Sequence, residues 1–330
     1  MPKTNFESRA AELELRPATL DDATIVADLE SLRDPEEPRD PILLRHWWRM
    51  GEELHRTMHS VAVRDGAAIA YIAASHERWD SEHKRFGVVR PVLRSDVWST
   101  DLFESLVEIG EDWLRAEDAA ISVVRVREDI IEDLGALERL GYREDRRMRM
   151  SELDLAANRD QMLATREESR RRMREQGIEM LPLSQVADPD RYRKLYEMWI
   201  ESEKDIPTTV PSRDLSPEEW KRFWFTNPAI REDHMWVAIQ DGHVAGISLL
   251  DTPVVRGVPW TAYTGTARAF RGRGIARALK YESIGQAIES GFTRVRTNND
   301  ADNPAILRIN QEMGYRLVAP LIELHRELDS

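Results

Sequence analysis

Residues 271–276 read RGRGIA, and they stand at a predicted junction between a strand and a helix. The preceding residues 260–270 are rich in β-formers, and from Ile275 onward apolar residues recur at helical spacing, at Ala278, Leu279, Ile284 and Ile288. Glycines at such a junction let the backbone approach a ligand closely, while the free N–H groups and the dipole of a helix start attract phosphate. The stretch therefore predicts an anion-binding turn.

Two other glycine-rich motifs fit this stretch less well. A dinucleotide-binding GxGxxG would need a third glycine where Arg277 stands, and it would follow the first strand of its domain. A phosphate loop of the Walker type needs Gly-Lys-Ser/Thr, which does not follow here. A glycine-rich turn without a ligand stays open as an alternative.

The two halves of the chain repeat each other. Residues 61–66 read VAVRDG and residues 237–242 read VAIQDG, and each predicts a strand, an Asp-Gly hairpin turn and a second strand. Further along, residues 137–142 (LERLGY) match residues 310–315 (NQEMGY). The repeat predicts a mixed α/β (α+β) fold of two tandem domains, each a mixed central sheet flanked by helices.

The segment between the halves sets the domain boundaries. It is polar, rich in Arg and free of Pro, and Gly177 stands where a helix would stop. We therefore expect a first domain over residues 1–155, a linker helix over 156–177 and a second domain over 178–330.

The composition excludes several classes of function. The chain of 330 residues carries a net charge of -13, which argues against a nucleic-acid partner. The absence of Cys excludes disulfides, thiolate metal sites and a cysteine acyl-enzyme, and the eight histidines show no ligand-like spacing, so no metal site is expected. No apolar run approaches the roughly 18 residues of a membrane span, and residues 1–14 contain no apolar signal core. These features predict a cytoplasmic protein with no membrane partner.

The glycine-rich loop and its surroundings resemble the GNAT family of acyl-CoA N-acyltransferases. The family's pyrophosphate loop has the pattern Gln/Arg-x-x-Gly-x-Gly/Ala, and residues 271–276 fit it at each specified position. Downstream, Asn303 and the pair Gly314-Tyr315 are similar to the family's helix that begins at an Asn and ends at Gly-Phe or Gly-Tyr. The resemblance covers residues 178–328.

This resemblance implies acetyl-CoA as co-substrate and assigns its contacts. The backbone of Thr266, Ala267 and Arg268 would pair with the pantetheine arm, and Asn303 would reach the coenzyme. The pyrophosphate loop would comprise Arg271, Gly272, Arg273, Gly274, Ile275 and Ala276.

Asn310 departs from the family pattern. Many members carry a Tyr at this position, four residues before the Gly of Gly-Phe, placed to protonate the departing thiolate. An amide cannot serve as a general acid, although a thiol of pKa about 8.5 leaves readily near neutral pH. Asn310 is predicted either to hydrogen-bond the coenzyme or to pack the helix.

The corresponding loop of the N-terminal half has lost the features that bind phosphate. In residues 94–99 (RSDVWS), Val97 stands in place of Gly274 and Ser99 in place of Ala276, and Asp96 adds a negative charge. We expect no acetyl-CoA site in this half. A chain in which one half keeps the coenzyme-binding loop and the other has lost it resembles the mycothiol-synthase-like tandem GNAT proteins.

Candidates for the chemistry lie near the end of the first helix of the C-terminal half. An attacking amine must lose a proton, which a carboxylate can accept. Glu203 and Asp205 precede the loop that borders the acceptor cleft in the family, and Tyr263 lies on the strand beside the coenzyme arm. We predict Glu203, Asp205 and Tyr263 as catalytic residues, with surface or packing roles left open for each.

Together these features predict an acetyl-CoA-dependent N-acetyltransferase. The acetyl group would pass directly to the primary amine of a small, cationic acceptor, because no Ser-His-Asp cluster supports an acyl-enzyme. The alternative is a catalytically weak acyl-CoA-binding regulatory module. The aromatic residues Trp199, Trp220, Phe223 and Trp224 fit either core packing or a cage for the substrate. The sequence makes no prediction of the oligomeric state.

Overall fold

The computed structural model describes residues 13–77, 85–205, 215–300 and 304–328. Its helices are α2 (Ala23–Arg33), α3 (Pro41–Leu54), α4 (Thr100–Ala116), α5 (Ile131–Arg139), α6 (Arg159–Glu175), α7 (Arg191–Glu203), α8 (Pro217–Phe225), α9 (Ile275–Glu289) and α10 (Pro304–Glu312). Its strands are β1 (Arg16–Pro17), β2 (His55–Arg64), β3 (Ala67–Glu77), β4 (Phe86–Leu93), β5 (Ile121–Arg127), β6 (Arg143–Asp154), β7 (Glu179–Pro182), β8 (Met235–Gln240), β9 (His243–Asp251), β10 (Trp260–Thr266), β11 (Arg294–Asp300), β12 (Arg316–Leu317) and β13 (Leu321–Glu327).

The strands of the described chain form one continuous sheet. Its order is β1-β2-β3-β4-β5-β13-β6-β11-β10-β9-β8-β7, with β12 paired to β6 at the side. The N-terminal half contributes an antiparallel meander, β2 to β4, followed by the parallel pair of β4 with β5. The C-terminal half repeats this arrangement with β8 to β10, followed by β10 with β11. The predicted mixed α/β fold, used twice, is confirmed.

Asp-Gly dipeptides turn the chain at the same place in both halves. Asp65 and Gly66 join β2 to β3, Asp241 and Gly242 join β8 to β9, and all four residues have φ between 49° and 77°. Gly and, less readily, Asp tolerate this left-handed region, which tight hairpin turns require. Local turn chemistry therefore produces the two hairpins predicted from the sequence.

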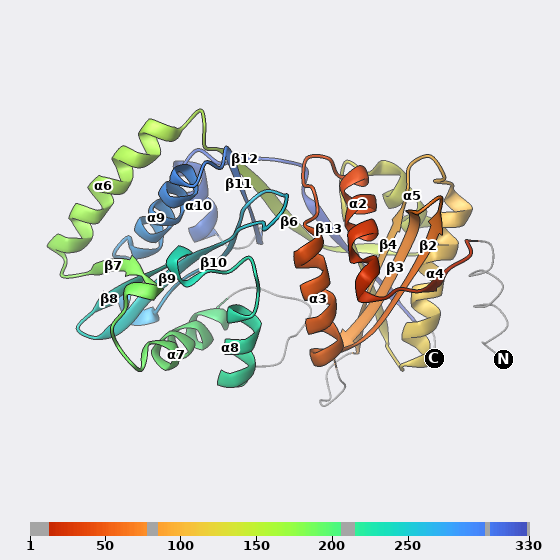
Figure 1. The fold of residues 1–330 in the computed structure, drawn as a ribbon, viewed down its shortest axis with the longest axis horizontal. Coiled ribbons are helices and arrows are strands. Elements are labelled where there is room, and N and C mark those ends of the chain that lie inside the picture. Colours follow the sequence, from red (N-terminus) through yellow and green to blue (C-terminus); the bar gives the residue numbers. More distant parts are fainter. Residues whose placement is uncertain (1–12, 78–84, 206–214, 301–303, 329–330) are drawn as a thin grey trace.

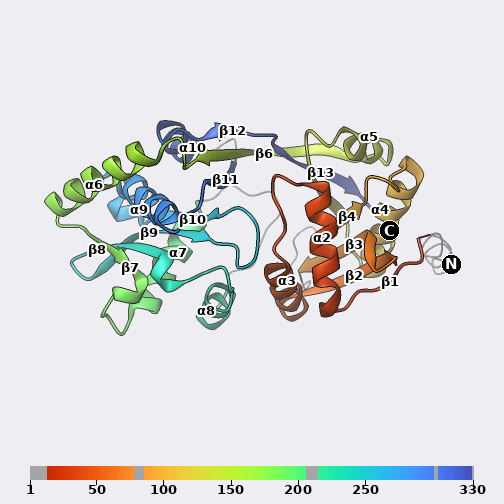
Figure 2. The ribbon, with the colours of Figure 1, turned by 45° about the horizontal axis from the view of Figure 1, so that its top comes forward.

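Two long strands join the halves, as Figures 1 and 2 show. β6 pairs with β13 over residues 143–148 and with β11 over residues 148–154. β13 lies between β5 and β6, although the repeat assigns this last strand to the C-terminal half. The end of the chain thus completes the sheet of the N-terminal half, a long-range pairing that the sequence did not predict. The domain boundaries at 155 and 178 remain a prediction.

The helix expected between the halves forms as α6, and it packs along α9. Met162 and Met173 of α6 are buried, and Arg170 pairs with Glu282 of α9 at 2.6 Å. Glu282 is buried in the middle of α9, so Arg170 neutralises a charge that would otherwise be costly there. α6 therefore covers one side of the C-terminal half.

The halves also meet through α3. Asp40, the N-cap of α3, accepts hydrogen bonds from the backbone N–H groups of residues 254–256 at 2.8, 2.6 and 3.2 Å. On the same helix the Trp47 ring packs against Phe223 of α8, with ring centroids 5.4 Å apart. These contacts hold the loop after β9 and the helix α8 against the N-terminal half.

Candidate active site

The C-terminal half contains a cavity where β10 and β11 separate. Among the described residues these parallel strands are paired at Trp260 and Arg296, and past this point β10 keeps its antiparallel partner β9. The cavity has a volume of about 680 Å³. Its lining residues are Ser202, Asp205, Tyr263, Thr264, Gly265, Thr266, Phe270, Arg271, Gly272, Arg273, Gly274, Ile275, Ala276, Arg277, Ile306 and Ile309. All six residues of the glycine-rich stretch therefore lie in one wall of this cavity.

The start of α9 is open to this cavity. Gly274 is the N-cap of α9 with φ of 82°, it carries no capping side chain, and Gly272 has φ of 76°. The first N–H groups of a helix have no partner within it, and a β-carbon added at either glycine would meet no atom within 4 Å. The loop thus combines a left-handed backbone with open space in front of the helix N-terminus, which is the geometry of an anion site.

The equivalent helix of the N-terminal half is closed. Ser99 is the N-cap of α4, and its hydroxyl accepts a hydrogen bond from the Leu102 N–H at 3.3 Å. Asp96 is held by Arg94 at 2.6 Å, and Val97 packs against the hydrophobic core of this half. Side chains of the protein itself therefore occupy the place that remains open at Gly274.

Of the three residues predicted to pair with the pantetheine arm, Thr266 lies in the cavity wall. The Ala267 N–H donates to the Ala245 carbonyl at 3.0 Å, and the Ala267 carbonyl accepts from Phe270 N–H at 2.9 Å. The Arg268 N–H donates to Glu201 Oε1 at 3.0 Å. The N–H groups of Ala267 and Arg268 are thus occupied in this structure, and their predicted contacts with the pantetheine arm stay a prediction.

Asp205 is paired with the loop and does not have the properties of a base. Its carboxylate accepts from Arg268 at 2.7 Å and from Arg271 at 2.6 Å. Hydrogen bonds from Arg268 and Arg271 hold the pKa of Asp205 well below its usual range. Asp205 therefore orients the arginines of the glycine-rich loop, and its predicted role as proton acceptor is not supported.

Glu203, the last residue of α7, has the opposite environment. Its side chain is half-buried, and Oε2 has no hydrogen-bond partner among the described residues. Burial raises the pKa of Glu203 above its ordinary value, because a carboxylate away from water is less stable in its charged form. Glu203 is thus the carboxylate of this region that is suited to accept a proton.

Tyr263 of β10 lies in the cavity wall, whereas Glu203 is not among the residues that line the cavity. Its hydroxyl is 2.7 Å from Ser202 Oγ, and the Ser202 hydroxyl donates to the Met198 carbonyl at 2.9 Å, so Tyr263 is the donor to Ser202. Burial raises the pKa of Tyr263, and the nearby charge of Glu203 acts in the same direction. Tyr263 therefore stays protonated and can orient a ligand in the cavity.

Asn310 does not belong to the cavity wall. It is 2% exposed, and its Nδ2 donates to Asn299 Oδ1 on β11 at 2.6 Å. This position fits the predicted packing of the helix, and the predicted contact with the coenzyme stays a prediction. Asn303, the other residue predicted to reach the coenzyme, lies outside the described residues.

Several lining residues were not predicted. Ile306 and Ile309 of α10 face the cavity together, and their spacing of three along a helix is the signal that could have identified them. The sequence gives no signal for Ser202, because its contact is a hydrogen bond with Tyr263, which lies 61 residues further along the chain.

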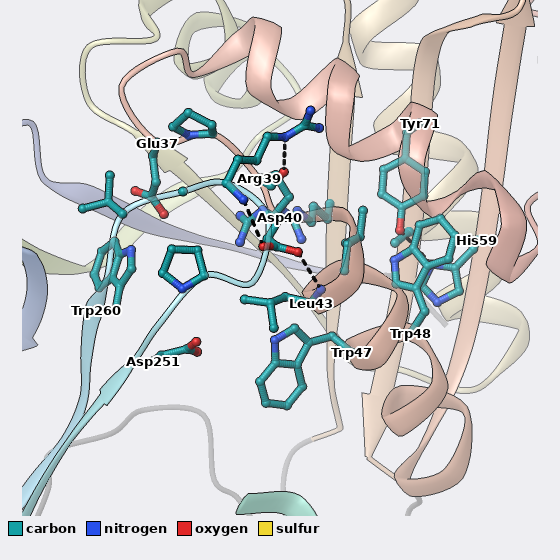
Figure 3. Close-up of a pocket in the computed structure, with 18 of the residues that line it drawn as sticks. Glu37, Arg39, Asp40, Leu43, Trp47, Trp48, His59, Tyr71, Asp251 and Trp260 are labelled. Carbon is teal, nitrogen blue, oxygen red and sulfur yellow. Dashed lines mark hydrogen bonds between the residues drawn. The ribbon is translucent and has the colours of Figure 1, made fainter. Parts of the chain in front are cut away.

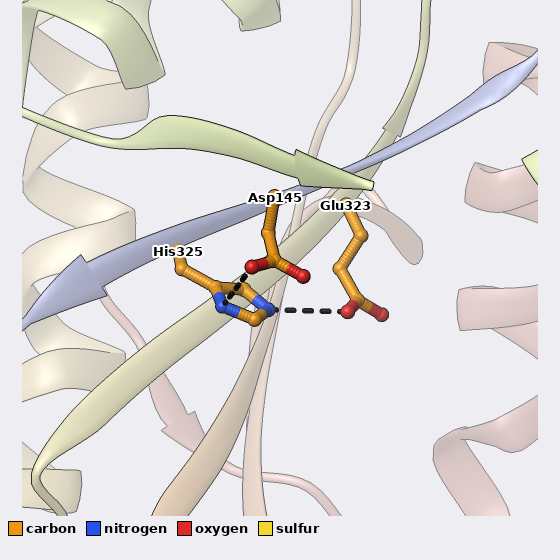
Figure 4. A group of neighbouring side chains, drawn as sticks. All are labelled: Asp145, Glu323 and His325. Carbon is orange, nitrogen blue, oxygen red and sulfur yellow. Dashed lines mark hydrogen bonds and ion pairs between the residues drawn. The ribbon is translucent and has the colours of Figure 1, made fainter. Parts of the chain in front are cut away.

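One group of possible metal ligands lies elsewhere, between β6 and β13 (Figure 4). His325 Nε2 is 3.1 Å from Glu323 Oε1, and His325 Nδ1 is 3.5 Å from Asp145 Oδ1. Each carboxylate thus faces a different ring nitrogen, and Arg125 also pairs with Glu323 at 2.7 Å. This arrangement is an ion-pair network around an imidazole. Within the described part of the chain, no helix is both long and apolar enough to cross a membrane.

Residues 192–315 match the model of the Acetyltransferase (GNAT) family. A GCN5-related N-acetyltransferase from Sphaerobacter thermophilus is similar over 95% of both chains, at 21% identity and a TM-score of 0.67. A tandem GNAT protein from the clavulanic acid biosynthesis pathway is similar over 96% of this chain and 98% of its own, at 12% identity and a TM-score of 0.73. At these identities the likeness shows a shared fold across nearly the whole chain. No curated protein sequence matches the chain.

Proposed function

We propose that the C-terminal half of the chain transfers an acetyl group from acetyl-CoA directly to the primary amine of a small, cationic acceptor. Residues 192–315 of this half match the GNAT family model. The observation that carries this proposal is the contrast between the two helix starts. The start of α9 is glycine-lined and open to a cavity, whereas the start of α4 is capped by Ser99. The proposal therefore places one coenzyme site in each chain.

Binding of the coenzyme would use the start of α9 and the free edge of β10. The N–H groups at the start of α9 would hold the pyrophosphate, with Gly272 and Gly274 allowing close approach. Thr266 and the adjoining edge of β10 would receive the pantetheine arm, because β11 has separated from β10 there. Asp205 would keep Arg271 in place beside the phosphates.

The chemistry requires one proton transfer by the protein. As the amine nitrogen attacks the thioester carbonyl carbon, a carbon–nitrogen bond forms and the carbon–sulfur bond breaks. Glu203 would accept the amine proton, directly or through one water, since its raised pKa makes it the best base of the region. The sulfur would leave as thiolate with little protonation, because Asn310 is no acid and a thiol pKa is about 8.5.

The net charge and the acidic groups support a cationic acceptor. At -13 the chain attracts cations toward any acidic cleft, and Glu203 lies near Tyr263 of the cavity wall. The family name and the solved structures described above concern acetyltransferases, which favours acetyl as the transferred group.

A thiol-release assay with acetyl-CoA and a panel of amines tests the proposal. We expect turnover with small cationic amines, products heavier by one acetyl group, and initial-rate plots that intersect because both substrates must be bound together. Acetyl-CoA binding without turnover of any amine would instead support the alternative of a regulatory acyl-CoA-binding module. Parallel plots, or an isolable acetyl-enzyme, would contradict direct transfer.

A further inference from the structure

A second cavity lies where the two halves meet (Figure 3). It has a volume of about 310 Å³ and is enclosed by α3 and β2 to β4 of the N-terminal half and by residues 251–260 of the C-terminal half. Aromatic side chains supply much of its wall, among them Trp47, Trp48 and Trp260. None of the residues predicted from the sequence lies in this cavity.

Asp251 is the charged group of this cavity that lacks a partner. Figure 3 shows its carboxylate pointing from the end of β9 toward Trp47 of α3. No hydrogen bond or ion pair reaches it from the described residues, and burial raises its pKa to about 6 despite the nearby charge of Arg39. Near neutral pH the cavity thus contains an ionised carboxylate facing aromatic rings.

The other charged groups of the wall are already satisfied. Arg39 and Arg90 both pair with Glu30, at 2.8 and 2.6 Å. Arg256 pairs with Asp28 at 2.5 Å. In the same wall, Glu37 pairs with Arg296 at 3.1 Å, and Asp40 accepts from backbone N–H groups of both halves. Asp251 is therefore the charged group of this wall that still lacks a partner among the described residues, and a positively charged group of a ligand would supply one.

We propose that this cavity binds an organic cation, with Asp251 as its counter-charge and the rings of Trp47 and Trp260 as its aromatic walls. Cations are attracted to the faces of aromatic rings, most strongly to Trp, and the attraction grows when water is excluded. A substituted ammonium group matches both features, whereas a metal ion would require several oxygen ligands that the wall does not offer within the described residues.

The position of the cavity suggests which substrate it would bind, and this part of the inference rests on the proposed function. Trp260 begins β10, and Tyr263 on the same strand lines the coenzyme cavity. A bulge between Thr261 and Tyr263 sets this stretch opposite the two-residue step from Asp251 to Leu249 on β9, which spans about 7 Å. Asp251 and Leu249 alternate to the same face of β9, and Leu249 is the partner of Tyr263, so the two sites open on one face of the sheet.

Aromatic contacts run between the two cavities. The ring centroids of Trp47 and Phe223 are 5.4 Å apart, those of Phe223 and Trp224 are 5.3 Å apart, and those of Trp224 and Tyr263 are 6.3 Å apart. An acceptor could lie along these rings with a cationic group at Asp251 and its reactive amine near Tyr263. The substrate class is therefore a diamine or a related dication whose nitrogens are separated by at least the roughly 7 Å between these strand positions.

Tetramethylammonium tests the site without catalysis, because it has the charge of an ammonium group and cannot be acetylated. We expect calorimetry on the full chain to show binding in the millimolar range, and no binding of the neutral analogue 2,2-dimethylpropan-1-ol. Asp251→Asn should weaken the affinity for tetramethylammonium at least tenfold, and Trp47→Ala should weaken it more than Trp47→Phe. Asp21→Asn removes an equal charge from a side chain that is 88% exposed and should leave the affinity unchanged.

Equal binding of the cation and the neutral analogue, or equal affinity in Asp251→Asn, would overturn the inference. A second assay separates it from the proposed function. If amines are acetylated, Asp251→Asn should raise the KM of long diamines several-fold while leaving kcat and the KM of a monoamine unchanged. An unchanged KM for diamines would contradict the proposal that one acceptor occupies both sites. If no amine is acetylated but tetramethylammonium binding depends on Asp251, the cation site stands and the proposed function fails.

Discussion

Glu203 and Asp205 show how two carboxylates at the same helix end acquire different chemistry. Asp205 lies within reach of Arg268 and Arg271, so its charged form is stabilised. Glu203 lies near Tyr263, and its buried Oε2 has no hydrogen-bond partner among the described residues. Their separation along the chain is two residues, and the environment of Asp205 is set by arginines more than sixty positions away.

Glu203→Gln should remove the proton acceptor of the proposed reaction. Because a base acts only when deprotonated, kcat/KM of the parent enzyme should rise with pH through a pKa above the ordinary value of Glu. The variant should lose this rise and fall in kcat/KM by about 100-fold. Asp205→Asn should instead weaken acetyl-CoA binding and keep the pH dependence. A pH–rate profile of each protein checks this, and an unchanged profile in Glu203→Gln would rule out the residue as the base.

Lys280 is a second residue whose burial has a measurable effect. It lies inside α9, its Nζ is buried without a hydrogen-bond partner in the described chain, and it stands 5.0 Å from the centroid of the Tyr315 ring. Burial lowers its pKa to about 7, below the unfolded value of 10.5. Between these values the unfolded chain binds more protons, so this group makes folding stability rise with pH from about 7 to 10.5.

Lys280→Met should therefore stabilise the protein at pH 7. The substitution keeps the side-chain length and removes a charge that costs at most about 4 kcal/mol to bury. We expect a higher Tm at pH 7, with the gain shrinking toward pH 10.5. Thermal denaturation of both proteins between pH 7 and 10.5 measures this change in Tm. A lower Tm of the variant at pH 7 would show that the ammonium group has a partner.

At the scale of elements, the loop before α9 (residues 271–276) and the loop before α4 (residues 94–99) differ in the residue at their fourth position, which is Gly274 in the first and Val97 in the second. A Val at position 274 would be strained at φ of 82° and would extend into the cavity at the start of α9. Gly274→Val should abolish acetyl-CoA binding, whereas Val97→Ala at the equivalent place should leave it intact. Calorimetry with acetyl-CoA should give a stoichiometry near one for the parent and for Val97→Ala; two sites per chain would contradict the closed state of the α4 loop.

At the scale of the whole molecule, β6 and β13 make the halves depend on each other. β6 is hydrogen-bonded to both sets of strands, and β13 carries the chain end back into the N-terminal sheet. Separate unfolding of one half would break one of these pairings. The sheet therefore joins the two repeats into one cooperative unit.

This cooperativity predicts a single thermal transition. Leu324 of β13 is 2% exposed in the core of the N-terminal half, so Leu324→Ala should cost about 2–5 kcal/mol. We expect calorimetry to show one transition in both proteins, moved to lower temperature in the variant, with acetyl-CoA raising the Tm of both. Two transitions, of which the variant shifts one alone, would show that the halves unfold independently.

The sequence by itself determined the features that depend on neighbouring residues. The Asp-Gly turns at 65–66 and 241–242, the glycine-rich start of α9 and the closed loop at 94–99 all follow from backbone preferences and capping within a few residues. The repeat was recognised from the Asp-Gly turns that occur in both halves, and the family resemblance from the glycine-rich loop.

Only the tertiary structure decided which distant groups meet. The place of β13 beside β5, the pairing of Asp205 with Arg268, the burial of Asn310 and the cavity that joins Trp47 to Asp251 all depend on contacts between segments far apart in the chain. A carboxylate has the same ordinary pKa wherever it stands in a sequence, and its function changes when folding brings an arginine, a ring or a dry cavity beside it. The candidate base Glu203 therefore depends on packing within the C-terminal half, and the proposed cation site depends on the packing of the two halves.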